Sequence, residues 1–229
     1  MKKAFLLFIL CNSFLCFCQE TPNSAEIDSL YREDQFYVNI SYNFLRNKPR
    51  NVIQNSFSTG INLGFLRDFP INKLRTLAIA PGLGLSYNNY KQNLFIDKDN
   101  TGIFDYKILT EADIFDKNKF SLYYADLPIE FRWRNSTFES HKFYRTYLGF
   151  KISYLLYSQS RFVSSSKSVT IDANPDFNKI LYSVYAAVGN NSVNVFVNYG
   201  LNSIFKQGMV NNEPIKISSL NIGLMFYIL

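Results

Sequence analysis

Large apolar residues alternate with small or polar ones at the C-terminal end of the chain, within residues 219–229. The large apolar residues on one face are Leu220, Ile222, Leu224, Phe226 and Ile228, and the small or polar residues opposite them are Ser219, Asn221 and Gly223. Successive side chains of a strand point to opposite sides. The segment therefore predicts a strand that separates an apolar environment from a polar one.

The same alternation recurs about eight times along the chain. It predicts strands near residues 35–44, 56–66, 74–90, 120–134, 143–157, 180–189, 193–203 and 219–229. A soluble β-protein buries its bulky face, whereas a transmembrane barrel turns that face toward lipid and keeps small polar residues inside. We therefore predict an all-β fold, an eight-stranded antiparallel up-and-down transmembrane β-barrel. The first and last strands must pair, because an open edge is not tolerated in lipid.

The connections between these strands alternate in length. Those after the second, fourth and sixth strands are short, whereas residues 91–119 and 158–179 form long connections. A membrane barrel has short periplasmic turns and long outer loops, so both termini are predicted to be periplasmic. Loops this long without structure of their own are usually functional, and their apolar residues suggest a partner. Pro81 and Pro128 lack an amide hydrogen and predict bulges or gaps in the ladder.

The N-terminus predicts an exported protein. Lys2 and Lys3 precede a short apolar run, and Cys16 and Cys18 stand at the −3 and −1 positions of a cut before Gln19. Residues 1–18 are therefore predicted to be a cleaved signal peptide, 19–34 a periplasmic tail and 35–229 the barrel. The alternative is a lipoprotein acylated on Cys18. The predicted location is the outer membrane of a Gram-negative bacterium.

Composition narrows the function classes. Removal of the leader lowers the formal net charge from +6 to +4, and no Lys/Arg run remains, so nucleic-acid binding is not suggested. No segment after the leader is apolar enough for a membrane helix. Aromatic residues reach 17%, and several are placed to form girdles at the membrane interfaces. These are Phe36, Phe44, Tyr87, Tyr90, Trp133, Tyr157 and Phe226.

Six charged residues are predicted to point into the lumen: Asp126, Glu130, Arg132, Arg134, Arg145 and Lys151. The interior of an eight-stranded barrel is packed with side chains, and buried charges there must be paired. The favoured interpretation is a salt-bridge network that plugs the barrel. The alternative is a path for protons or ions.

No catalytic set is evident, and we predict neither enzymatic activity nor a cofactor. His141 is the only histidine. It stands beside Ser140 in a short turn, and the sequence gives no third residue that would complete a catalytic triad with them. A cation site is predicted at Asp97, Asp99, Thr101 and Asp105, where oxygen ligands alternate as in the first half of a calcium loop. Ile108 replaces the glutamate expected at the twelfth position of that loop.

Four short segments carry a family resemblance, and they are Pro81-Gly82-Leu83-Gly84, Asp126-Leu127-Pro128-Ile129, Tyr147-Leu148-Gly149 and Tyr199-Gly200-Leu201-Asn202. In this order and spacing the chain resembles the PorT-like outer-membrane β-barrels of the Bacteroidota, although Asp126 stands where glutamate is commoner. The resemblance implies an eight-stranded barrel that is located in the outer membrane. It implies no single activity and supplies no catalytic residues.

These observations predict a non-enzymatic barrel that is a structural or accessory subunit of an outer-membrane complex of the secretion or barrel-assembly type. Its expected partners are outer-membrane lipid and other outer-membrane or periplasmic proteins. One alternative is a small-solute channel or surface-binding barrel. Another is a secreted lipocalin-like binder, which would need the aromatic faces to point inward.

Overall fold

The computed structural model describes residues 34–54, 56–99, 101–134, 144–190 and 192–228. The chain divides into two compact units, Met1–Tyr31 and Arg32–Leu229, and all described residues belong to the second. The predicted signal peptide, nearly all of the predicted tail and the His141 turn lie outside the described residues. The described part has no helix long and apolar enough to cross a membrane.

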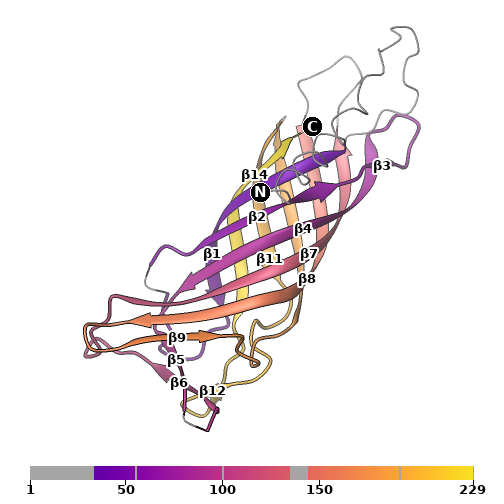
Figure 1. Cartoon of the computed structure of the whole chain (residues 1–229). Helices are drawn as coiled ribbons and strands as arrows, with labels where there is room; N and C mark the ends of the chain where they lie inside the picture. Colours follow the sequence, from indigo (N-terminus) through magenta and orange to yellow (C-terminus); the bar gives the residue numbers. More distant parts are fainter. Residues whose placement is uncertain (1–33, 55, 100, 135–143, 191, 229) are drawn as a thin grey trace, which may run out of the picture. The chain divides into compact units, whose positions relative to one another are not determined.

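Eight long strands form a closed antiparallel barrel (Figure 1). They are β1 (Gln35–Arg46), β2 (Thr59–Leu66), β4 (Leu77–Lys91), β7 (Lys117–Arg134), β8 (Tyr144–Val163), β10 (Ile180–Asn190), β11 (Val193–Gly200) and β14 (Ser218–Ile228). Each pairs with its neighbour in sequence order, and β1 pairs with β14 from Phe36↔Ile228 to Arg46↔Ser218. The predicted fold class and the pairing of the first strand with the last are thus confirmed.

The alternation of side chains also follows the prediction. In β1, Phe36, Ile40 and Phe44 are exposed on the outer face, while Asn39 and Ser41 are buried inside. The apolar faces of all eight strands point outward, and this excludes the lipocalin-like interpretation, which required them inside.

The exposed apolar face of β7 has the length that a membrane requires. Trp133 and Tyr123 are both exposed on its outer face, and Phe131, Ile129 and Leu127 lie between them. Ten residues of strand extend about 34 Å, or about 26 Å along the axis at a tilt of about 40°. That matches the apolar band of about 25 Å, flanked by aromatic residues, of outer-membrane barrels.

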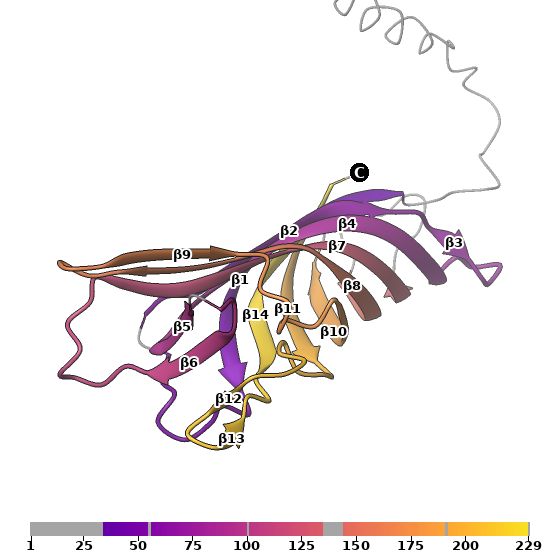
Figure 2. The same cartoon turned by 60° about the horizontal axis from the view of Figure 1, so that its bottom comes forward.

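The long connections contain strands, which corrects the expectation that they are loops without structure of their own. β7 and β8 continue beyond the barrel as an arm, on which β9 (Ser168–Asp172) pairs with β8 (Figure 2). β5 (Leu94–Lys98) pairs with β6 (Phe104–Ile108), and β12 (Met209–Val210) with β13 (Glu213–Pro214). Figure 1 shows these strands at one end of the barrel and β3 (Phe69–Pro70) at the other.

We call these the loop end and the termini end. At the loop end, apolar side chains from the connections and the barrel strands form one core, the cap. Its members include Leu94, Tyr106, Phe120, Phe177 and Phe205. Packing between these connections converts them into a folded layer, because the apolar residues that looked out of place in water are buried against one another.

Tyr90 belongs to this core and is only 3% exposed. Its predicted place in an outer aromatic girdle is therefore wrong. The reason is the period of two: Tyr90 shares the inward face of β4 with Ser86, and its ring packs 5.0 Å from that of Phe120.

The two prolines interrupt pairing without shifting the register. Between β4 and β7 the paired residues pass from Pro81↔Ile129 to Gly84↔Asp126, so the ladder has a local gap. The register shift lies elsewhere, between β7 and β8, where Tyr123 opposes Tyr157 and Tyr124 opposes Leu155. This bulge turns Tyr157 and the following alternate residues of β8 outward.

A chain that ends at Ser219 should fail to fold into a barrel. It would lose the β14 residues that pair with both β1 and β11, and two edges would then open in lipid. Heat-modifiable migration on gels in detergent measures barrel closure, and the truncated chain should show none. A matched control replaces Asn211 and Asn212 with glycine, which suits their positive φ values of 49° and 62°. Folding of the truncated chain as well as the control would contradict the closure argument.

Candidate functional site

Four buried charges form a connected network at the termini end of the lumen. The Arg132 guanidinium donates from Nε to Glu130 Oε2 at 2.9 Å and from Nη1 to Asp68 Oδ1 at 3.0 Å. Arg134 Nη2 donates to the other Asp68 oxygen at 3.0 Å. All four side chains are fully buried. Such pairs persist in a low dielectric only when their remaining hydrogen bonds are also made.

Tyrosines from other strands complete the hydrogen bonding of Glu130. The hydroxyls of Tyr185 and Tyr227 donate to its Oε1 at 2.9 and 2.8 Å. The Arg132 guanidinium also lies over the Tyr147 ring, 4.9 Å from its centroid. The network therefore joins β7, β8, β10 and β14 across the lumen, and Asp68 ties in the connection after β2.

Asp68 and the tyrosine partners are the members of this network that the sequence prediction missed. A signal for Asp68 existed, because it continues the inward series of β2 through Asn62, Gly64 and Leu66. Arg145, which was predicted, is buried opposite Arg134 at the same end.

The other two predicted charges form a separate pair in the middle of the lumen. Asp126 accepts from Ser153 Oγ at 2.5 Å and from Lys151 Nζ at 3.3 Å. The prediction of one network is thus refined into two groups. Beside the pair lies a band of asparagines from five strands, joined by side-chain hydrogen bonds. Its members are Asn39, Asn43, Asn62, Asn88, Asn198 and Asn221.

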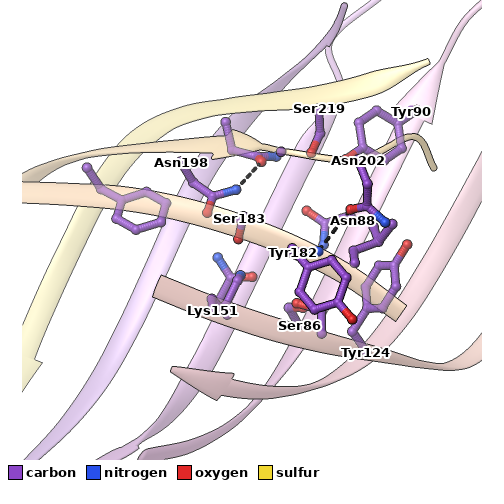
Figure 3. A pocket seen from close by; sticks show the side chains of 16 residues that line it. Ser86, Asn88, Tyr90, Tyr124, Lys151, Tyr182, Ser183, Asn198, Asn202 and Ser219 are labelled. Carbon is purple, nitrogen blue, oxygen red and sulfur yellow. Dashed lines mark hydrogen bonds between the residues drawn. The ribbon is translucent and has the colours of Figure 1, made fainter. Parts of the chain in front are cut away.

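Two small cavities lie within this packing of the described residues. One of about 30 Å³ lies between the asparagine band and the cap, and Figure 3 shows Ser86, Tyr124 and Lys151 around it. The other, of about 10 Å³, lies next to Tyr37 and Tyr185. A cavity needs a volume of roughly 10–15 Å³ to hold a single water molecule. Neither cavity of the described lumen admits a solute larger than water.

The outer surface of the cap carries two grooves that share Ile114. One has a volume of about 650 Å³ and includes Ile53, Ile108 and Phe115. The other, of about 330 Å³, includes Phe95. Ile114 stands between them and is 85% exposed, the highest value among the large hydrophobic residues described. An apolar side chain so placed loses contact with water only when a partner covers it.

Asp113 holds the turn that presents Ile114. Its Oδ2 accepts from the backbone N–H of Thr110 at 2.9 Å and the Thr110 hydroxyl at 3.0 Å, and its Oδ1 accepts from Lys107 Nζ at 3.1 Å. The Thr110 N–H, then the Lys107 ammonium and the Thr110 hydroxyl, lower the pKa of the Asp113 carboxyl. The carboxylate is therefore charged at neutral pH, and its hold on the turn weakens as the pH falls through that lowered pKa.

A second acidic anchor lies inside the cap. Tyr106 donates its hydroxyl to Asp176 at 2.6 Å, and Gln207 Nε2 donates to the other Asp176 oxygen at 2.7 Å. Burial, together with the hydrogen bond to Asp176, raises the pKa of Tyr106, so its proton is retained. This contact joins β6 to the connections before β10 and β12, and it fixes the cap as one unit.

The predicted cation site lies on the β5–β6 hairpin, where Asp97 opposes Asp105. Asp99 Oδ1 accepts three hydrogen bonds, from Thr101 N and Oγ1 and from Ile103 N. Asp97 Oδ2 accepts from Lys167 Nζ at 2.8 Å. No group of three acidic, His or Cys residues in the described part is arranged to hold a metal. Calcium binding here stays a prediction.

The sequence from 17 to 206 matches the model of the outer membrane protein beta-barrel domain. The chain belongs to this family. It is therefore an outer-membrane β-barrel, as its apolar outer face and closed sheet require. No curated protein is similar enough in sequence to count as a relative.

Solved structures of other outer-membrane barrels are similar at low identity. Ail of Yersinia pestis in complex with the heparin analogue sucrose octasulfate has 10% identity and a TM-score of 0.42; the match covers 87% of this chain and 100% of that one. Ail without the analogue has 11% identity and a TM-score of 0.37 over the same shares. A porin of Rhodopseudomonas blastica has 7% identity and a TM-score of 0.22, over 86% and 100%. Similarities with such low TM-scores do not support an assignment. The assignment of this chain as a barrel rests on its strand pairing.

Replacement of Arg132 by methionine should strongly destabilise the barrel. It would leave Glu130 and Asp68 buried without their shared cation, a loss that typically costs about 3–5 kcal/mol. The free energy of unfolding in urea, measured in detergent, checks this. The control is Lys73→Met, because Lys73 is exposed. If both variants unfolded at the same urea concentration, the network would have no stabilising role.

The purified barrel should not conduct ions in planar bilayers. Its described lumen is filled by the charge network, the asparagine band and the cap, and its cavities are of water size. Single-channel recording measures this, with a general-diffusion porin in the same bilayers as the positive control. Reproducible unit currents that Lys151→Met alters would show an open path past the Asp126 pair.

Proposed function

We propose that this protein is a non-enzymatic outer-membrane barrel that serves as a structural or accessory subunit of an outer-membrane protein complex, of the secretion or barrel-assembly type. The observation that carries this proposal is Ile114, exposed between two grooves and held there by Asp113. A rigid apolar side chain costs little conformational entropy on binding, which makes it suitable as the anchor of an interface.

The filled lumen supports the same conclusion. A solute channel needs a continuous wet path, and a binding barrel needs an internal cavity of a few hundred Å³. The two lumen cavities are far smaller, whereas the grooves on the cap reach that size. Recognition at the cap surface therefore fits the volumes better than transport or ligand storage does.

We further propose that the chain is PorT-like, on the four segments that carry this resemblance, although the resemblance by itself favours no single activity. We also propose that the termini end faces the periplasm and the cap faces the outside. The partner would then be an outer-membrane protein whose own loops reach the height of the cap, while periplasmic proteins could contact the opposite end.

Substitution of Ile114 by glutamate should release the partner without unfolding the barrel. The tagged chain would be purified from envelopes in mild detergent, and quantitative mass spectrometry would measure its stoichiometric companions. We expect at least a tenfold loss of the main companion, because burial of a charge at an interface centre typically costs 2 kcal/mol or more.

The matched control is Ile103→Glu, since Ile103 is also exposed but lines neither groove. Equal melting temperatures of the three proteins would establish that folding is intact. The proposal fails if the unchanged protein purifies alone, or if both glutamate variants retain the same companions.

A further inference from the structure

Three cations form one row across adjacent strands on the outer face of the sheet, at the level where β9 pairs with β8 on the arm. Lys91 of β4 pairs with Lys119 of β7, and Lys119 pairs with Arg161 of β8. Adjacent strands are about 4.8 Å apart, so the row spans about 10 Å. Their outward direction follows from alternation: the neighbours Tyr90 and Phe120 are buried in the cap core.

The bulge in β8 creates this alignment. Without the register shift between Tyr123 and Tyr124, Arg161 would fall on the opposite face of the arm. With it, Arg161 stands beside Lys119 on the outside, while Phe162 packs against Phe95 underneath.

No ion pair within the described chain neutralises the row. None of the three cations has an acidic partner among the ion pairs of the described residues. Asp172 of β9 lies nearby and accepts from the Tyr157 hydroxyl at 2.5 Å and from Gln159 Nε2 at 3.0 Å. These neutral donors leave it charged, but it forms no ion pair with the row. Like charges directly opposite each other on a sheet are destabilising, so the arrangement is favourable only beside an anion.

The position of the row relative to the membrane identifies that anion. A parallel row of aromatic rings, Tyr87, Tyr123 and Tyr157, lies four residues closer to the termini end on the same strands, with centroids 4.9 and 5.7 Å apart. Aromatic residues of this kind mark the membrane interface. Four residues of tilted strand place the cations about 10 Å farther out, at the level of lipid headgroups.

We propose that Lys91, Lys119 and Arg161 form a binding site for the phosphate groups of lipid headgroups with a net negative charge, in the leaflet at the loop end. Arg161 can bind a phosphate through two parallel N–H bonds, and the flanking lysines add point charges on flexible stems. The tyrosine row would contact the upper part of the lipid. This site lies on the outer face of the sheet where the arm begins, and none of its three cations lines the grooves beside Ile114.

The test compares binding of lipid A, whose sugar headgroup carries phosphates, with binding of phosphatidylcholine and of inorganic phosphate. Fluorescently labelled lipid A would be titrated into the full-length protein in detergent. The double variant Lys119→Gln/Arg161→Gln should bind it about 25-fold more weakly, from about a factor of five per cation. The matched control Lys206→Gln/Lys216→Gln removes two exposed cations from the connection between β11 and β14 and should bind like the unchanged protein.

Several outcomes would overturn the proposal. These are equal affinity of both double variants, equal binding of phosphatidylcholine, or full competition by millimolar inorganic phosphate, which would indicate a site for free anions. The salt dependence of the unchanged protein is a second measurement that needs no variant. Its affinity for lipid A should fall as NaCl rises from about 0.05 to 0.5 M, because salt screens exposed charges, and an unchanged affinity would contradict the assignment.

Discussion

The pairing of β1 with β14 is the contact on which the rest of this structure depends. It closes the sheet, so that the backbone groups of both strands are satisfied without water. Closure with eight strands also fixes a narrow bore. Everything inside must then fit that bore, and everything bulky must face the lipid.

The narrow bore explains the composition of the lumen. Gly149 makes room for Tyr185, whose ring a Cβ at this position would meet, and this leaves the Tyr185 hydroxyl in reach of Glu130. Charged groups placed in so dry a space must find partners, and Arg132 accordingly bridges Glu130 and Asp68. The network is thus a consequence of closure as much as a contributor to stability, and it occupies the space that a channel would need.

A filled barrel can act only through its surfaces. At the loop end the connections fold over the mouth and build the cap core, which leaves Ile114 exposed outside. On the wall, the outward residues pass from apolar through aromatic to cationic along β4, β7 and β8. The two surfaces present different chemistry, one apolar and one cationic. They suit a protein partner and a lipid headgroup respectively.

Alternation in the sequence alone was enough to predict the eight strands, their outward faces and the closing pair, because period two and the demands of a lipid environment act locally along each strand. The six lumen charges followed from the same parity. The partners of those charges did not: Asp68, Tyr185 and Tyr227 reach Glu130 and Arg132 from distant positions, and only closure brings them together. The cap and the bulge also escaped prediction, since the cap depends on packing between the connections and the bulge belongs to the pairing of β7 with β8. Arg161 shows the result, because its face depends on the register shift between β7 and β8. Tyr90 faces inward by the alternation of β4 itself, and the cap core is what buries its ring.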